Sequence, residues 1–338
     1  MPFAQFQFEA RRALLARACG VALVAGLSHG PALASPQQHL HVEVELVSEL
    51  AVAAPGRPVT VAVRLKPEAG WHSYWQNPGD SGLATRIDWQ LPDGVQAGPI
   101  QWPFPHRESL GPLTNFGYAD EHFLLTELAL PAATGWAALE LKAAVSWLVC
   151  QEICIPGSAE LSLRLPFGEP ATSTWADAIA ASRAAVPQPL PVPAQFAVVG
   201  QQFRLQLEAG EWSAAELAFY PLTTELVANA AEPQIEQGEQ WVEVSLPVSE
   251  YFSAAPATME AVLVLDERRA VQVQARRVDA GQLLERGDPA TPLETALMPG
   301  TELSLAFALL LAFAGGLILN LMPCVFPVLS IKIGRAHV

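Results

Sequence analysis

Two cysteines, Cys150 and Cys154, are separated by three residues in the segment SWLVCQEICIPG, residues 146–157. A disulfide needs Cα atoms about 4.4 to 6.8 Å apart, whereas four residues of extended chain span about 13 Å. The pair can therefore close only across a tight turn or one helical turn. Because a loop of five residues stabilises a fold by only about 2 kcal/mol, the spacing favours a reversible disulfide that reacts by thiol–disulfide exchange.

Two other interpretations of this pair stay open. The disulfide could be purely structural. The thiols could also ligate zinc or copper, but two further ligands would have to come from distant residues such as His106 and His122. Glu152 lies between the cysteines and would raise their pKa values, and no Lys or Arg lies nearby in the sequence to lower them. The pair is therefore expected to be a passive carrier that a more reactive partner attacks.

A third cysteine, Cys324, lies in the apolar segment NLMPCVFP, residues 320–327. The two prolines of this segment each remove a backbone donor and disrupt a helix. Such a break is tolerated at membrane depth only where the backbone is buried in protein or faces water, and broken helices at the midplane usually mark transport. The sequence therefore predicts an accessible thiol at Cys324.

The N-terminus has the pattern of an export signal. Three arginines precede a short apolar run at residues 18–27, and Ala32-Leu33-Ala34 is typical of a cleavage site. We expect residues 1–34 to be removed as a signal peptide, together with Cys19. The mature protein would then lie in an oxidising compartment where disulfides persist.

The C-terminal region has the pattern of a membrane span. Residues 303–331 carry no charged side chain, a length sufficient to cross the hydrocarbon core, and Lys332 follows directly. The positive flank at this end predicts that the acidic domains lie outside the cytoplasm. Residues 301–332 are thus expected to be a first transmembrane span and 281–300 its tether. Residues 333–338 are interpreted as foreign to the natural protein, which we expect to continue with further spans.

The region between these ends is acidic and predicted to be mainly β. Acidic residues outnumber basic ones by 34 to 19, and a surface of this charge repels phosphate backbones, which excludes nucleic-acid binding. Alternating apolar residues predict half-buried strands at 59–65, 161–165, 203–207 and 241–246. Short strands separated by Pro/Gly turns indicate a β-sandwich.

One helix and a proline-rich linker divide this region. The stretch Thr174 to Ala185 opens with Ser/Thr capping candidates and ends before Pro187, which predicts a helix. The linker at 187–193 separates a β domain at 35–186, which holds the cysteines, from a second β-rich domain at 194–280. The second domain has no Cys or His, so redox or metal chemistry is not expected there.

Three separated motifs resemble one protein family. NLMPCVFPVLSIK, residues 320–332, resembles the first membrane span of the DsbD family of transmembrane thiol:disulfide reductases, and residues 146–157 are similar to the cysteine-bearing segment of their periplasmic N-terminal domain. GWHSYWQNPGDSGLAT, residues 70–85, resembles the branch that includes the copper-sensitivity suppressor proteins. The resemblance implies that the exported domain is an immunoglobulin-like sandwich.

The resemblance also implies an electron relay. Cytoplasmic thioredoxin would donate electrons to the membrane domain, and the exported domain would pass them to oxidised periplasmic thiol proteins. Cys150 and Cys154 match the N-terminal pair of the family, and Cys324 matches the first membrane cysteine. Phe116 and Tyr118 lie where the family keeps an aromatic cap over the cysteines, although ordinary core aromatics are an equal alternative. The chain departs from the best-known members in its three-residue spacing and its second β segment.

The sequence therefore predicts an inner-membrane protein-disulfide reductase whose residues 35–300 lie in the periplasm and whose partners are thioredoxin-like proteins and membrane lipid. No cofactor or resident metal is expected. The segment Gly70 to Thr85, with Trp71, Tyr74 and Trp75, is expected to pack or to dock a partner without a catalytic group. A copper-handling protein, suggested by His39, His41 and the Cys150/Cys154 pair, and a membrane-anchored adaptor with a structural disulfide are the alternatives.

Overall fold

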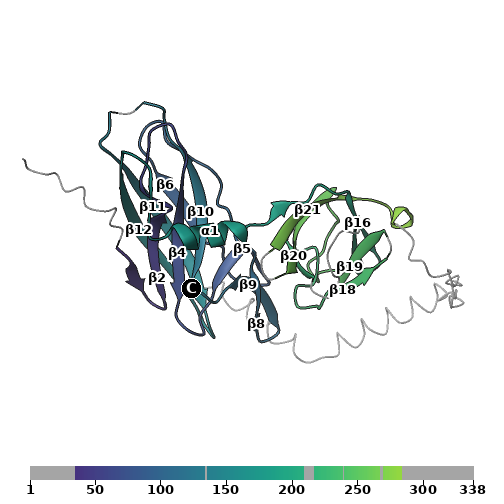
Figure 1. The fold of residues 1–338 in the computed structure, drawn as a ribbon. Helices are drawn as coiled ribbons and strands as arrows, with labels where there is room; N and C mark the ends of the chain where they lie inside the picture. The colour runs from purple at the N-terminus through teal and green to yellow at the C-terminus, as the bar shows by residue number, and fades with distance from the viewer. Residues whose placement is uncertain (1–34, 134, 209–216, 239, 267–268, 284–338) are drawn as a thin grey trace, which may run out of the picture. The chain divides into compact units, whose positions relative to one another are not determined.

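The structure is a computed structural model, and the part of the chain that it describes is mainly β (Figure 1). The described residues lie in one compact unit, which spans Met1–Arg286. Within them, no helix combines the length and the apolar character needed to cross a membrane. The predicted signal peptide and membrane span fall outside the described ranges, which are residues 35–133, 135–208, 217–238, 240–266 and 269–283.

Two antiparallel sheets of the first β region pack face to face. In spatial order, the strands of one sheet are β1 Gln37–His39, β2 Val42–Ser48, β4 Val59–Pro67, β10 His122–Ala129 and β7 Gln96–Ala97. The strands of the other sheet are β12 Cys154–Pro166, β11 Ala138–Cys150 and β6 Arg86–Gln90. The inward side chains of both sheets form one apolar cluster. The half-buried strand predicted at 161–165 is confirmed, whereas the strand predicted at 59–65 is present but buried on both faces, because Ala62 packs in a second cluster with Ile179.

A third, smaller sheet lies beside this pair and carries residues of the site described below. Its strands, in spatial order, are β5 Ser73–Gly79, β9 Leu113–Tyr118 and β8 His106–Leu110. The register between β5 and β9 shifts after Tyr74, where Gly117 lies opposite. A short ladder joins β13 Ala171–Thr172 to β3 Leu50–Val52.

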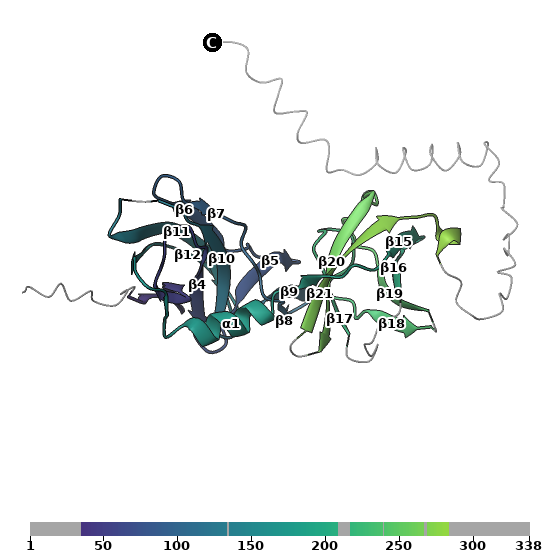
Figure 2. The ribbon, with the colours of Figure 1, turned by 45° about the horizontal axis from the view of Figure 1, so that its top comes forward.

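The predicted helix is present and begins two residues later than expected, as α1 Ala176–Ala184 (Figure 2). Trp175 is its N-cap and has no side-chain capping bond, but Ser173 Oγ accepts the Trp175 N–H at 2.9 Å, just before the helix begins. The helix packs on the outer face of β4 and β10, where Ile179 is buried in a small apolar cluster. Its end precedes Pro187, as predicted.

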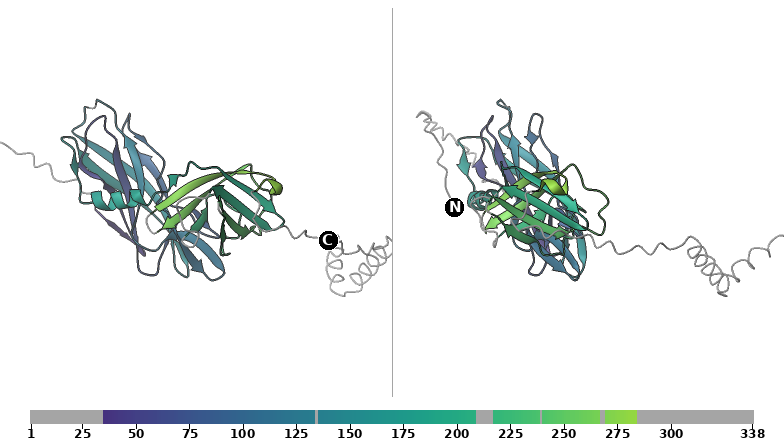
Figure 3. Two further views of the ribbon diagram at one scale, coloured as in Figure 1. Left: turned by 45° about the vertical axis from the view of Figure 1, so that its right-hand side comes forward. Right: turned by 90° about the vertical axis from the view of Figure 1, so that its right-hand side faces the viewer.

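The second β region is built around one sheet (Figure 3). In spatial order its strands are β17 Ala218–Pro221, β20 Thr258–Asp266, β21 Arg269–Arg277, β15 Ala194–Val199, β16 Gln202–Glu208, β19 Trp241–Pro247 and β18 Gln234–Gln237. The strands predicted at 203–207 and 241–246 are present as β16 and β19, but they are not half-buried, because Gln206, Glu243 and Ser245 on their other face are buried as well. A 3-10 turn, η2 Ala280–Gln282, follows.

The linker and some core residues connect the two regions. Within the predicted linker, β14 Gln188–Pro189 pairs in parallel with β21. The apolar cluster of the first region also includes Tyr220, Val262, Val264 and Ala270 from the second. The two β regions therefore share part of one core. The domain boundary at 187–193 stays a prediction.

Candidate redox site around Cys150 and Cys154

The hairpin formed by β11 and β12 brings the two cysteines together. Cys150 and Cys154 are register partners, their Cα atoms are 4.1 Å apart, and a disulfide joins them. Both backbone hydrogen bonds of Cys150 go to His72, at 3.0 Å each. Cys150 therefore faces Cys154 as a non-hydrogen-bonded pair, in which the Cα atoms of antiparallel strands approach most closely. The pair closes across a tight turn, which is one of the two geometries that the spacing allows.

The two sulfur-bearing residues differ in exposure. Cys150 is fully buried, whereas Cys154 is exposed on the outer strand of the hairpin. The three residues of the turn are exposed as well, including the carboxylate of Glu152 and the apolar side chain of Ile153. A reactant from solvent can therefore reach Cys154 first, and an apolar surface borders the point of attack.

The phenol of Tyr74, in β5, lies against both sulfurs. Its hydroxyl donates a hydrogen bond to Cys150 Sγ at 2.8 Å and lies 3.6 Å from Cys154 Sγ. Burial raises the pKa of Tyr74, and a hydrogen bond with Ser81 offsets this only in part, so the phenol stays protonated and can donate. The aromatic pattern of residues 70–85 predicted packing or docking, but nothing in it indicated that Tyr74 contacts the sulfurs.

A tight loop after β5 packs over the Tyr74 ring. Gly82 has φ of 100°, and a Cβ added there would lie 2.2 Å from Tyr74 Cε1. Ser81 holds the loop through its backbone N–H and its hydroxyl, both bonded to Asn115 Oδ1 at 3.0 Å. The position of the phenol over the disulfide therefore depends on the backbone of this loop.

His72 is a second buried group near the sulfurs. Its ring meets that of Tyr74 edge to face, with the centroids 5.2 Å apart. Burial lowers the pKa of His72 below 6.5, so the imidazole is neutral at pH 7. Its Nε2 is buried, and the described residues provide it with no hydrogen-bond partner.

A buried Ser–His pair stabilises the small sheet. Ser73 Oγ lies 3.0 Å from His122 Nε2, and His122 Nδ1 lies 2.9 Å from the backbone oxygen of Asp120. Because that oxygen can only accept, Nδ1 carries the proton and Nε2 accepts the Ser73 hydroxyl. Burial lowers the pKa of His122 to about 4. Ser73 is completely buried, so this pair has no access to a substrate and its role is structural.

The predicted cap residues lie in β9, next to β5. Phe116 is fully buried and its ring lies edge to face against Tyr220, with centroids 5.4 Å apart. The Tyr118 hydroxyl donates to Pro103 O at 2.7 Å, and its ring stacks on His122. The aromatic ring that the structure places on the sulfurs is that of Tyr74, so the cap role of Phe116 and Tyr118 stays a prediction.

The histidines considered as metal ligands are each in other contacts. His41 stacks on Trp71 and its Nδ1 lies 2.8 Å from Glu68 Oε2, while His39 meets Trp147 edge to face. His106 is exposed in β8. Among the described residues, no three His, Cys, Asp or Glu side chains gather in a way that could hold a metal ion.

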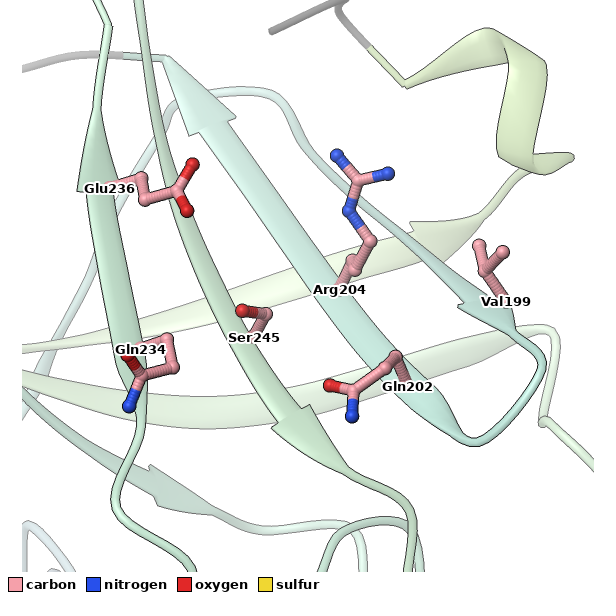
Figure 4. A pocket seen from close by; sticks show the side chains of 6 residues that line it. All are labelled: Val199, Gln202, Arg204, Gln234, Glu236 and Ser245. Atoms are coloured by element: carbon pink, nitrogen blue, oxygen red, sulfur yellow. The ribbon is translucent and has the colours of Figure 1, made fainter. Parts of the chain in front are cut away.

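A separate hollow lies on the outer face of the second region (Figure 4). Its volume is about 460 Å³, and polar side chains of β16, β18 and β19 line most of it. Arg204, at its edge, forms a bidentate ion pair with the buried Glu243. Neither cysteine nor histidine is among the residues that line the hollow. Cys324 lies outside the described residues.

Comparisons with known proteins agree with this geometry. Residues 42–166 match the family model for the N-terminal part of thiol:disulfide interchange protein DsbD. The chain is also similar to the crystal structure of the N-terminal periplasmic domain of ScsB from Proteus mirabilis. The TM-score is 0.55 at 20% identity, over 73% of this chain and 96% of that one, which is a likeness of fold. No curated protein matches the chain.

The family match contains β11, β12 and the turn between them, and so both cysteines. It also contains β5, β8 and β9, which carry Tyr74 and the predicted cap residues. The match therefore covers the whole site described above. On this evidence, residues 42–166 belong to the family of DsbD N-terminal domains.

Proposed function

We propose that the Cys150–Cys154 pair is redox-active and exchanges two electrons with thioredoxin-like partner proteins. The observation that carries this proposal is the asymmetry of the disulfide, in which an exposed residue, Cys154, is bonded to the fully buried Cys150, whose sulfur has its own hydrogen-bond donor. Membership of a thiol:disulfide interchange family supports it. A five-residue loop contributes only about 2 kcal/mol to stability, so the fold can lose the bond and persist.

The exposed sulfur determines the order of events. A thiolate of the partner attacks Cys154 Sγ, a new S–S bond forms between the partner and Cys154, and the bond to Cys150 breaks. Cys150 leaves as a thiolate with the electron pair of the broken bond. The partner's second thiol then attacks the mixed disulfide, which releases Cys154. Two electrons and two protons have moved from the partner to this chain, and the reverse sequence returns them.

Tyr74 assists the departure of Cys150. A thiolate that forms at a fully buried position loses the stabilisation of water, which raises its energy. The Tyr74 hydroxyl already points at this sulfur from 2.8 Å and can donate to the developing negative charge. Hydrogen bonds to charged groups contribute about 1.5 to 3 kcal/mol. Tyr74 is thus assigned the role of hydrogen-bond donor to the leaving thiolate.

We further propose the wider setting that the sequence predicts. Residues 35–300 would lie in the periplasm, residues 301–332 would anchor them in the inner membrane, and Cys324 would belong to the membrane part of the relay. Likeness to a periplasmic domain supports the location. The two face-to-face sheets of the first region support its assignment as an immunoglobulin-like sandwich.

Equilibration with redox buffers tests the proposed function. The full chain is incubated in glutathione or dithiothreitol buffers of known potential, its thiols are alkylated, and mass spectrometry quantifies the peptide that carries both cysteines. This peptide readout separates the pair from Cys19 and Cys324. We expect a potential above about −300 mV, the upper limit for structural disulfides. A pair that stays oxidised at that potential would contradict the proposal.

Single cysteine variants test the order of events. The remaining thiol of each variant is first activated as its mixed disulfide with thionitrobenzoate. In Cys150→Ser, the thiolate of a thioredoxin-like protein that lacks its resolving cysteine should attack Cys154 Sγ, release thionitrobenzoate and form a stable mixed disulfide. Cys154→Ser leaves only the buried thiol and should form much less. Equal yields of both adducts on a denaturing gel would show that exposure does not select the attacked sulfur. Tyr74→Phe should slow reduction of the wild-type pair about tenfold, the factor that about 1.4 kcal/mol produces.

A further inference from the structure

The second β region contacts the loop that packs over Tyr74. Asp80 begins this loop and is bonded to Thr114 of β9 twice: its backbone N–H donates to Thr114 O at 3.0 Å, and its Oδ2 accepts the Thr114 N–H at 2.8 Å. The other carboxylate oxygen, Oδ1, accepts a hydrogen bond from Asn229 Nδ2 at 2.9 Å. The link between Asp80 and Asn229 joins positions that are 149 residues apart in the sequence.

The same segment of the second region also holds the neighbouring hairpin. The Arg107 guanidinium, in β8, donates to the backbone oxygens of Asn229 and Ala231. Arg107 also lies over the Phe116 ring, 5.9 Å from its centroid. The residues around Asn229 therefore contact both the loop and the hairpin of the small sheet.

A third contact reaches β5 itself, on the strand that carries Tyr74. Asn77 Nδ2 donates to Pro221 O at 2.7 Å, and the Tyr220 ring lies edge to face against Trp75. Every element of the small sheet is thus in contact with the second region. The loop is the one of these elements that bears most directly on the disulfide, because Gly82 lies against the Tyr74 ring and Tyr74 contacts both sulfurs.

We propose that Asn229 is a positioning residue for the redox site: through Asp80 it holds the 80–83 loop against Tyr74 and so keeps the phenol on the sulfur of Cys150. The second β region then helps to fix the geometry of the site, although it contributes no group that touches the disulfide. This inference deepens the proposed function and rests on it. When the Asn229 contact is lost, the loop relaxes, the Tyr74 hydroxyl leaves the sulfur, and the Cys150 thiolate loses its donor.

The test is the rate at which dithiothreitol reduces the Cys150–Cys154 bond in the full chain, followed by alkylation and mass spectrometry of the cysteine peptide. Asn229→Leu removes the hydrogen bond without a change in charge, and Asn229→Asp places two carboxylates together. Both are expected to slow reduction about threefold to tenfold, the effect of one hydrogen bond of about 1 kcal/mol. Gln237→Glu, which adds a charge at an exposed position of β18, is the control and should leave the rate unchanged.

Two further variants separate positioning from simple structural damage. The exchange Asp80→Asn with Asn229→Asp keeps the total charge and reverses the polarity of the link. The amide introduced at position 80 can accept from the Thr114 N–H while it donates to the carboxylate introduced at position 229, so the rate should return to within twofold of the wild type. In a Tyr74→Phe background, Asn229→Leu should have no further effect, because its influence passes through the phenol. The exchanged pair keeps the proposal testable even if a single variant fails to fold.

The outcomes distinguish the two proposals. A wild-type disulfide that resists dithiothreitol would overturn the proposed function. A reducible wild-type disulfide with unchanged rates in folded Asn229→Leu and Asn229→Asp would overturn only the role of Asn229. Slow reduction in the exchanged pair, or an equal effect of Asn229→Leu with and without the Tyr74 hydroxyl, would also overturn it.

Discussion

The two β regions bury different kinds of residue. The core of the second region is almost entirely apolar, and its buried polar residues are Gln206, Glu243 and Ser245, on the outer face of its sheet. The first region buries many more polar groups, and most of those near the disulfide belong to the small sheet or its neighbours: His72, Ser73, Asn77, Thr114, Asn115 and His122.

This difference shows where the fold departs from simple packing rules. Buried polar groups are costly unless they are hydrogen-bonded, and a network of them specifies one arrangement of the backbone. In natural proteins such departures are expected at functional sites. The polar small sheet, which holds Tyr74 on the sulfurs, is such a place, whereas the second region provides an apolar scaffold.

The largest loss of stability is expected from substitutions where the two regions meet. Phe219 and Tyr220 are neighbours in β17, but Phe219 packs in the core of the second region and Tyr220 in that of the first. Replacement of either by Ala should lower the free energy of unfolding by about 3 to 5 kcal/mol. Urea denaturation measures this loss for each variant.

Hydrogen exchange then locates the damage. Only Tyr220→Ala should reduce the protection of the β9 amides, because Tyr220 packs on Phe116 and Trp75. Phe219→Ala is its matched control, with a similar volume removed from the adjacent residue of the same strand. Unchanged protection of β9 in Tyr220→Ala would mean that the regions are energetically independent.

A smaller decrease in the free energy of unfolding is expected when the pH is lowered. Because His122 is unprotonated down to about pH 4 when folded but titrates near 6.5 when unfolded, the unfolded state binds more protons between these values. Stability is therefore fully present above pH 6.5 and falls as the pH is lowered towards 4. At pH 5 the loss should reach about 2 kcal/mol.

Denaturation at several pH values measures this dependence. His122→Gln should flatten it between pH 6.5 and 5, whereas His106→Gln, at an exposed position, should not. An equally steep dependence in His122→Gln would refute the assignment.

The smallest effect on stability is expected from alanine substitution at two glycines with positive φ. Gly82 faces the Tyr74 ring, whereas Gly200, in the turn between β15 and β16, has nothing within 4 Å of an added Cβ. Alanine should cost about 1 kcal/mol at Gly200 because of the backbone conformation, and more at Gly82, where the added Cβ also overlaps the Tyr74 ring. Only Gly82→Ala should also displace the phenol and slow reduction of the disulfide. A slower reaction in Gly200→Ala would show that the effect is general destabilisation.

Features that depend on neighbouring residues could be predicted from the sequence. Alternation of apolar side chains is a local property, so the strand from Val59 onward was predicted. The spacing of Cys150 and Cys154 limited their closure to a tight turn or one helical turn, and the structure has the tight turn. The helix was also predicted, although its first turn was placed too early. Ser173 bonds to Trp175 before the helical geometry begins, and this local choice is not visible in the pattern.

The contacts that define the site could not be predicted in this way. Tyr74 is 76 residues from Cys150, and Ser73 is 49 residues from His122. Their meeting depends on how β5 pairs with β9, and a register shift makes that pairing irregular. An aromatic cluster in the sequence shows that large side chains are available, but it does not show which one reaches the sulfurs. The link from Asn229 to Asp80 is longer still and has no sequence signature.

The position of the disulfide in its hairpin bears on how a partner is released. The bond closes only the last register pair next to the turn, while the pairing from Ala138 to Val149 is held by the rest of the ladder. Oxidised and reduced forms should therefore present almost the same surface to a docked protein. The shape of the surface would then not lower the affinity for the partner after the electrons have moved. Dissociation would depend on the loss of the covalent S–S link, which makes product inhibition a natural property of such a carrier.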